Sequence, residues 1–346
     1  MLGEKLRIAP TCYHVLHLIP VMVAHEMNFF SDEGLRGEDG LPNYEIIRDS
    51  MVPFGLEKLG ISQAMKEKSV DIALDVQTRT VFFQRSRGAD LYIIAGWRNQ
   101  HIHVWIGTPE IKSLAELKGK RIGINDIGDN QHWAISTWIR KAGLDPDRDV
   151  HWVRGIFHPL HIEALRSGKV DCVAVLVWEA ERLKKERFNP LVTLQQQYPN
   201  GRPERIIAAT GRILEERPAM VKGFLKGMIR AYWFMRDPDR NYNYIYNLEK
   251  RLRQQSPDAE ERTMKFTFHS PLRMEGMPFP IDGLPTGFED LLREEKAAGD
   301  LNYDVPAIED VCALDLVKEA FNELKERKEL KGDLERASAV AERYGY

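Results

Sequence analysis

Two short segments near the start of this chain combine aromatic, imidazole, amide and carboxyl groups where a predicted strand gives way to a helix. In the first segment, the ring of Tyr13 can stack on a flat molecule, and the imidazole of His14 can hydrogen-bond or accept a proton. In the second, Gln77 and Thr78 lie where backbone N–H groups at a helix start can hold a carboxylate. Asp75 is expected to be the N-cap of that helix. Both segments are therefore candidates for contact with a small molecule.

A third segment, at the start of a later helix, contains Gly128, Asn130 and Gln131 as candidate ligand contacts. Asp126 and Asp129 lie in the same loop and would repel a sulfonate or phosphate unless they point away. A strongly anionic tetrahedral ligand is therefore disfavoured. A carboxylate held by backbone N–H groups remains open.

The fourth segment contains Trp178, a wide apolar wall, and Glu179, which can pair with an amine or carry a proton. His101 and His158 are candidate hydrogen-bonding partners for the same ligand. A metal site built from His14, His101 and His158 is conceivable. No HExxH spacing or paired cysteine spacing supports it, so no metal ligand is assigned and no cofactor is expected.

Other catalytic signatures are missing from the sequence, which has no GxSxG nucleophile elbow, phosphate loop or GxGxxG fingerprint. The three cysteines, Cys12, Cys172 and Cys312, show no paired spacing, which fits a reducing compartment. Cys12 is expected to be a small buried residue and not a nucleophile.

An internal echo indicates the elements that position these segments. The run 64–75 reappears as 164–175, and each copy reads as the end of a basic helix, a turn and a Val-Asp step into an apolar strand. A second echo links the strands at 5–9 and 119–124. Two similarly built α/β lobes follow, with a cleft between them. Ligands of open α/β sheets sit beyond the carboxyl ends of the strands.

Hydrophobic periodicity places the remaining elements. Strands are expected at 6–9, 44–48, 70–74, 91–97, 101–106, 151–153 and 170–176. Helices are expected at 20–30, with Pro20 in the first turn, and at 55–68, 161–167, 218–234, 309–324 and 325–346. The chain is expected to cross from one lobe to the other after residue 98 and to return after residue 190. Lobe one therefore contains residues 1–98 plus 191–346, and lobe two contains 99–190.

Composition excludes several classes of protein. The chain is 43% hydrophobic and 29% charged, as in ordinary soluble globular proteins. Its net charge of −3 gives no electrostatic case for a nucleic-acid partner. No apolar run approaches the roughly 20 residues that span a bilayer, so membrane insertion is not expected. The first residues lack a secretion signal, so the expected location is cytoplasmic, or periplasmic if a leader was removed.

Several phrases resemble the type II periplasmic-binding-protein superfamily, in the branch of thiamine-pyrimidine-synthase-like proteins and sulfonate, taurine and nitrate binders. The matching phrases lie at 20–35, 113–121, 141–144, 167–171 and 208–226. The resemblance implies an α/β fold: a two-lobed clamp with a mixed sheet in each lobe, a helical C-terminal extension and closure at a hinge.

Two functions remain open. The first is reversible binding of a small carboxylated or heteroaromatic molecule in the interlobe cleft, with a transporter permease as partner if the chain is exported. The second is an enzyme on the same scaffold. It would be an aromatic-acid decarboxylase with His14 or Glu179 as proton donor, or a pyrimidine-precursor synthase. The synthase is weakened because the sequence has no cysteine-rich iron motif. The sequence does not determine the oligomeric state.

Overall fold

The chain is divided into two compact units in the computed structural model. The model describes residues 5–11, 15–47, 69–99, 103–128, 130–156, 160–193, 198, 200–254, 279–297, 299 and 301–344. Unit 1 contains Met1–Asn99, Asn200–Leu291 and Leu301–Tyr346, and unit 2 contains Gln100–Pro199 and Leu292–Asp300. The boundary expected after residue 190 falls inside a strand of unit 2, β9.

Each unit is built on one five-stranded sheet, and the strands of the two sheets follow the same pattern of directions, with the antiparallel strand in the fourth place. In unit 1 the order is β2-β1-β3-β10-β4, and in unit 2 it is β7-β6-β8-β5-β9. The strands of unit 1 are β1 (Leu6–Pro10), β2 (Tyr44–Ile46), β3 (Ile72–Gln77), β4 (Tyr92–Arg98) and β10 (Arg205–Ala209). The strands of unit 2 are β5 (His103–Gly107), β6 (Arg121–Gly123), β7 (His151–Val153), β8 (Cys172–Leu176) and β9 (Asn189–Thr193).

In each sheet one strand runs against its neighbours. β10 pairs antiparallel with β3 and β4, and β5 pairs antiparallel with β8 and β9. The other pairs, β1 with β2 and β3 and β6 with β7 and β8, are parallel. The expected α/β class with a mixed sheet in each lobe is therefore confirmed.

The predicted Val-Asp repeat is confirmed by its hydrogen bonds. The Asp71 N–H donates to the Arg7 carbonyl (2.9 Å), and the Asp71 carboxylate accepts the Arg7 N–H (2.9 Å). In unit 2 the Asp171 N–H donates to the Arg121 carbonyl (2.8 Å), and the Asp171 carboxylate accepts the Arg121 N–H (2.8 Å). The aspartate therefore makes the same pair of hydrogen bonds in both copies, and these bonds join the start of one strand to its parallel neighbour.

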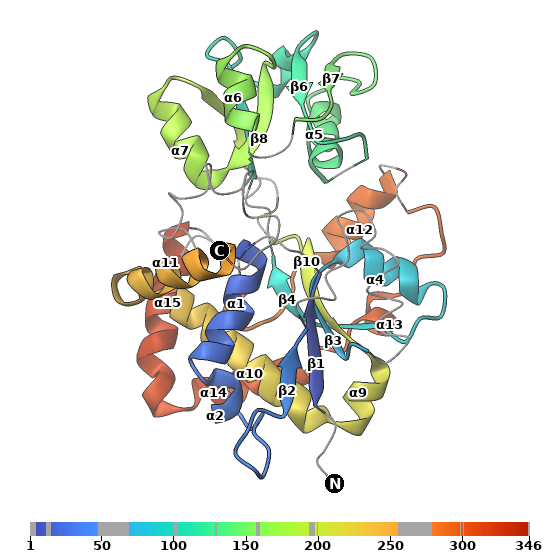
Figure 1. Ribbon diagram of the computed structural model, residues 1–346. Helices are drawn as coiled ribbons and strands as arrows, with labels where there is room; N and C mark the ends of the chain where they lie inside the picture. Colours follow the sequence, from blue (N-terminus) through green and yellow to red (C-terminus); the bar gives the residue numbers. More distant parts are fainter. Residues whose placement is uncertain are drawn as a thin grey trace. The chain divides into compact units, whose positions relative to one another are not determined.

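Helices of unit 1 lie on both sides of its sheet, with α1, α2 and α10 on one side and α4 and α9 on the other (Figure 1). These helices are α1 (Val15–Glu26), α2 (Phe29–Asp32), α4 (Thr78–Arg85), α9 (Gly211–Glu216) and α10 (Pro218–Met235). The remaining helices after α10 are α11 (Pro238–Gln254), α12 (Phe288–Ala297), α13 (Ile308–Val311), α14 (Asp315–Lys325), η4 (Lys328–Leu330) and α15 (Lys331–Tyr344). The expected helical C-terminal extension is confirmed.

Pro20 lies inside α1, not in its first turn as expected. A proline there removes one hydrogen bond of the helix. Pro20 itself is buried, and the apolar residues around it, such as Ile19 and Val21, are fully buried in unit 1. Burial of this apolar surface outweighs the cost of the lost bond. The helix then stops at Glu26, because Asn28 takes a left-handed conformation (φ 59°) before α2 begins.

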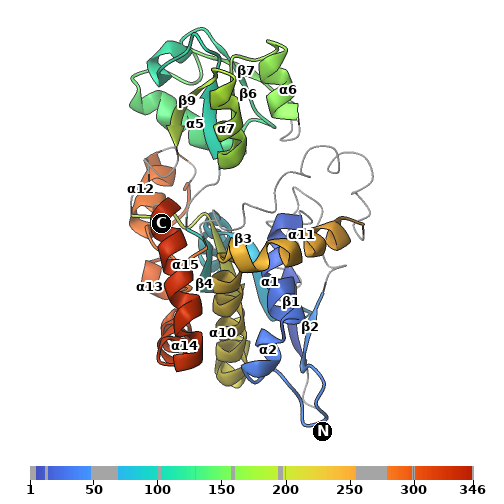
Figure 2. The ribbon, with the colours of Figure 1, turned by 90° about the vertical axis from the view of Figure 1, so that its left-hand side faces the viewer.

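A buried carboxylate attaches the C-terminal extension to the rest of unit 1. The Glu33 side chain is only 2% exposed and accepts hydrogen bonds from Arg230 (2.7 Å) on α10 and Arg327 (2.6 Å) after α14. Lys226 of α10 lies 3.2 Å away. The helices α10 and α14 run side by side in both views (Figures 1 and 2). Three cations thus compensate one carboxylate that would be costly to bury alone.

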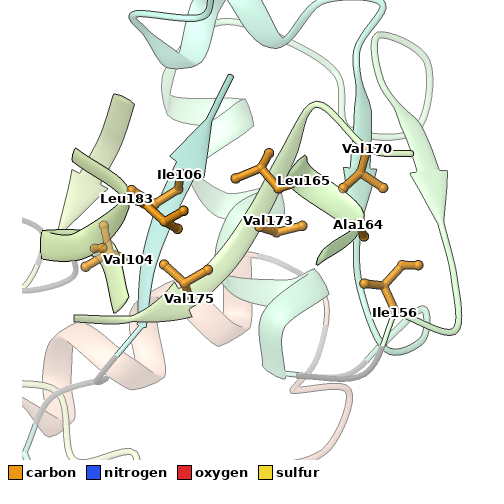
Figure 3. Close-up of a cluster of buried hydrophobic side chains, with 10 residues drawn as sticks. Val104, Ile106, Ile156, Ala164, Leu165, Val170, Val173, Val175 and Leu183 are labelled. Atoms are coloured by element: carbon orange, nitrogen blue, oxygen red, sulfur yellow. The ribbon is translucent and has the colours of Figure 1, made fainter. Parts of the chain in front are cut away.

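The helices of unit 2 include η1 (Leu114–Leu117), α5 (Asn130–Lys141), α6 (His161–Arg166) and α7 (Val177–Lys185). One of its apolar clusters joins β5 and β8 to α6 and α7 (Figure 3). The labelled members from strands and helices are Val104, Ile106, Val173, Val175, Ala164, Leu165 and Leu183. Their burial holds the repeated strand β8 in the centre of the sheet.

Candidate functional site

The carboxyl ends of the parallel strands are the edges at which the candidate ligand contacts were expected. In unit 1, β3 ends at Gln77, which is also the N-cap of α4, and Thr78 opens that helix. Arg79 donates to the Gln77 side-chain oxygen (3.1 Å). The Thr78 hydroxyl donates to the Pro203 carbonyl, and the Thr78 N–H donates to the Glu204 carbonyl (3.3 Å). Thr78 therefore ties α4 to the segment before β10.

Asp75 is not the N-cap that the sequence led us to expect. It lies inside β3, fully buried, in a left-handed conformation (φ 60°). The pairing with β10 shifts register between Ile206 and Ala208, so the strand bulges at this point. The Asp75 carbonyl accepts the Thr11 hydroxyl (2.8 Å) and an Arg205 N–H (3.1 Å). The bulge therefore turns a backbone acceptor toward these two side chains.

The Asp75 carboxylate also acts on a tyrosine behind the sheet. Burial raises the pKa of Tyr232 well above its ordinary value, and the negative charge of Asp75 raises it further. The Tyr232 ring stacks on Phe279, with 4.8 Å between ring centroids, and its hydroxyl faces the Gly96 carbonyl at 3.4 Å. Tyr232 is therefore held as a neutral hydrogen-bond donor and does not act as a proton carrier near neutral pH.

Several polar groups of the candidate loop in unit 2 are bonded to neighbouring residues. The Asp126 carboxylate accepts the Ile127 N–H (2.8 Å) and pairs with Arg154 (2.7 Å). The hydrogen bond from Arg154 holds the pKa of Asp126 below its ordinary value. The Gly128 N–H donates to His132 Nδ1 (3.1 Å). Arg154 pairs with Asp126, and Asp129 lies outside the described residues, so the expected repulsion of a tetrahedral anion by the two aspartates stays a prediction.

Gln131 lies in the first turn of α5, with its side-chain oxygen buried and without a hydrogen-bond partner among the residues that the structure describes. Asn130 begins the same helix. Buried polar atoms are nearly always paired, so this acceptor has room for a donor from water, from a residue outside the description or from a ligand. The geometry therefore singles out Gln131 among the candidates of this loop.

Several candidates lie wholly or partly outside the described residues. Tyr13, His14, His101 and His158 fall there, as do Cys12 and Asp129. The backbone of Trp178 lies in the first turn of α7, while its side chain is outside the description; Glu179 follows it, half-buried. Their roles stay predictions.

The described thiols, one buried and one half-buried, are poorly suited to nucleophilic chemistry. Cys172 is fully buried, and burial raises the pKa of its thiol well above the ordinary value. Burial also raises the pKa of Cys312 to about 12. Neither thiol ionises near neutral pH, so neither supplies the thiolate that reacts.

Two features of the described residues bear on the kind of protein this is. No group of three or more His, Cys, Asp or Glu side chains there is arranged to hold a metal ion. Within the same residues, every helix is too short or too polar to cross a bilayer.

Sequence reasoning missed a group of buried charges in unit 1. Arg98 ends β4, and Arg202, Glu204 and Arg205 lead into β10; all four are at most 9% exposed. The signal was present as charged residues directly beside apolar strand runs. It was not recognised because β4 and β10 are a hundred residues apart in the chain.

Known structures share the fold of the whole chain at low sequence identity. A putative sulfonate ABC transporter component from Methylobacillus flagellatus KT, the periplasmic sulfonate-binding protein SsuA, is 14% identical with a TM-score of 0.60, covering 94% of this chain and 96% of that one. The periplasmic nitrate-binding protein NrtA from Synechocystis PCC 6803 is 13% identical with a TM-score of 0.61, covering 94% and 90%. The desulfurization enzyme DSZB is 13% identical with a TM-score of 0.59, covering 92% and 99%.

These likenesses show the type II periplasmic-binding-protein-like fold that the sequence resembles. No curated protein sequence matches the chain significantly. A family model described as NMT1/THI5 like matches residues 16–241, which is more than half of the chain. The chain therefore belongs to the NMT1/THI5-like family.

Proposed function

We propose that this protein reversibly binds a small carboxylated or heteroaromatic molecule, as the solute-binding component of an ABC import system. The observation that carries the proposal is the buried side-chain oxygen of Gln131, in the first turn of α5, which has no hydrogen-bond partner among the described residues. A ligand N–H or O–H would satisfy it. Closure of two lobes on the ligand stays a prediction from the family resemblance.

The structural neighbours support this assignment. SsuA and NrtA are described as periplasmic sulfonate-binding and nitrate-binding proteins. They favour the periplasmic expectation over the cytoplasmic one, and a transporter permease as partner. Because Arg154 pairs with Asp126, that aspartate does not exclude a carboxylate ligand.

Native mass spectrometry of freshly purified protein tests the proposal, because a solute-binding protein retains its ligand when affinity is high. The compound that co-purifies is then titrated calorimetrically into wild type and Gln131→Leu. We expect about tenfold weaker binding in the variant, since one hydrogen bond to a buried group contributes about 1.5 kcal/mol. Thr137→Ala is the matched control on α5, because the Thr137 hydroxyl donates to the Trp133 carbonyl of its own helix.

Failure to find any bound solute, together with no thermal stabilisation by a panel of aromatic acids and heterocycles, would refute the binding function. The enzymatic alternative is tested on the same panel by chromatography. DSZB is an enzyme of this fold, so turnover of an aromatic acid by wild type that is lost in His14→Gln or Glu179→Gln would favour a catalyst.

A further inference from the structure

One helix of unit 1 has an arginine in its first turn, at the edge of the sheet where ligand contacts were expected. Arg79 is the second residue of α4, just beyond the carboxyl end of β3, and its side chain is half-buried. The start of a helix carries a partial positive charge, so a cation there is unfavourable unless an anion compensates it. The first turn of α4 contains no acidic residue. Arg79 therefore lacks the local counter-charge that a structural arginine at this position would need.

The hydrogen bond that Arg79 makes within unit 1 leaves the far end of its guanidinium available. Arg79 Nε–H donates to Gln77 Oε1 (3.1 Å), and this bond restrains the plane of the group. The two terminal nitrogens have no hydrogen-bond or ion-pair partner among the residues that the structure describes. Together they form a planar fork that matches the two oxygens of a carboxylate. Arg79 is thus oriented to hold such a group end-on.

The arginine at the other end of the same helix makes a different set of contacts. Arg85 is the last residue of α4, where a cation is favourable. Its Nε and one terminal nitrogen donate to the Asp310 carbonyl (3.2 and 2.8 Å), and the other terminal nitrogen donates to the Ala89 carbonyl (2.9 Å). Every nitrogen of the Arg85 guanidinium is therefore bonded within unit 1. Arg85 has a structural role that Arg79 does not share.

The second copy of the repeat has the opposite charge at the matching place. The runs 64–75 and 164–175 are a hundred residues apart, so the counterpart of Arg79 is Glu179, in the first turn of α7. A carboxylate is the charge that a helix start favours. The same strand and helix thus form in unit 2 without an arginine, and the fold does not require Arg79.

We propose that the Arg79 guanidinium is an anion subsite of unit 1 that receives the carboxylate of the ligand end-on, with Gln77 as the residue that positions Arg79. This inference rests on the proposed binding function and narrows it, because it makes the ligand a carboxylate anion. Ligands of open α/β sheets lie beyond the carboxyl ends of the strands, which is where Arg79 lies in unit 1.

Pairs of an aromatic acid and its amide test the subsite, because the two members share a ring and differ in charge. Calorimetric titration of the full chain compares benzoate with benzamide and nicotinate with nicotinamide. Wild type should bind the acid about tenfold more tightly, the scale of a hydrogen bond to a charged group. Arg79→Gln should abolish that preference, and Arg79→Lys should retain part of it by keeping the charge. Arg87→Gln, which removes an exposed cation just after α4, is the matched control and should keep the preference.

Thermal unfolding without ligand separates a binding role of Arg79 from a structural one. Arg79→Gln should keep or raise the Tm, because it removes a cation from a helix start. A second variant, Gln77→Glu, places a carboxylate beside Arg79 and should lower the preference for the acid by competing for the guanidinium. If Arg79→Gln fails to fold, Gln77→Glu takes its place in the titrations.

Equal affinity of wild type for acid and amide, or an unchanged preference in folded Arg79→Gln, would overturn the subsite and leave the binding function standing. If no pair binds, the co-purified solute is titrated into the same variants. A solute without a carboxylate, or one whose affinity Arg79→Gln leaves unchanged, would also overturn the subsite alone. If wild type binds neither the probes nor any co-purified solute, both proposals fail.

Discussion

The two sheets of this protein share a pattern of strand directions, but the residues of their central strands differ. Asp71 and Asp171 occupy matching places, and the carbonyl of each accepts the N–H of a threonine just after the antiparallel strand, Thr210 (3.2 Å) and Thr108 (3.0 Å). The positions four residues further on diverge, with Asp75 in a bulge and Val175 in a regular strand. Features kept in both copies support the fold, and features present in only one are the better candidates for function.

The largest expected effect comes from introducing an aspartate into unit 2 at the position that matches Asp75 of unit 1. Val175 is fully buried among apolar side chains of α6, α7 and β5 (Figure 3). Val175→Asp should lower the free energy of unfolding by about 4 kcal/mol or more, because a carboxylate there has no partner. Urea unfolding followed by circular dichroism measures it. Lys169→Asp, at an exposed position of the same repeat, is the control; a similar loss in both variants would contradict the explanation.

A smaller effect is expected from the shared aspartate of unit 1. The Asp71 side chain is 3% exposed and pairs with Arg212 (2.5 Å). Asp71→Asn should cost about 3 kcal/mol of unfolding free energy, the scale for breaking a buried pair. Asp171→Asn should cost less, because that side chain is 20% exposed and surface pairs contribute little. Equal urea midpoint shifts in the two variants would show that burial does not distinguish the copies.

A substitution in the turn before β8 should lower the free energy of unfolding by a smaller amount. Gly168 takes a left-handed conformation (φ 69°) with open space where a side chain would be. Gly168→Ala should therefore cost about 1 kcal/mol from backbone strain alone. Gly168→Asn, a residue that tolerates this conformation, should cost less in the same urea titration. A neutral or stabilising Gly168→Ala would mean that the turn adopts another conformation.

The smallest effect concerns pH. The hydrogen bond from Arg121 holds the pKa of the Asp171 carboxyl below its ordinary value. A carboxyl with a lowered folded pKa stabilises the protein above its unfolded pKa of about 3.9, and that stability is lost as pH falls through the folded value. The difference in unfolding free energy between wild type and Asp171→Asn should be constant from pH 7 to 5 and shrink below about pH 4. A difference that grows on acidification would contradict the pairing.

Much of the fold could be predicted from local pattern. The strand 151–153 was predicted with the bounds of β7, and the Val-Asp echo identified matching strands in two lobes. These features depend on residues close in sequence, because side-chain periodicity and turn residues act within a few positions. The candidate loops at Gln77 and Gln131 followed from the same reading, since each comes directly after a strand or begins a helix.

The sequence by itself therefore determined the class of fold, its internal repeat and the edges at which ligand contacts were sought. Tertiary structure alone decided that β10 enters the first sheet between β3 and β4, and that Pro20 lies within a buried helix. It also decided that Asp75 lies in a β-bulge and is not the N-cap of a helix, and that Arg98 pairs with Arg205 across the sheet. Each of these depends on pairing or packing between segments far apart in the chain, which no local periodicity encodes.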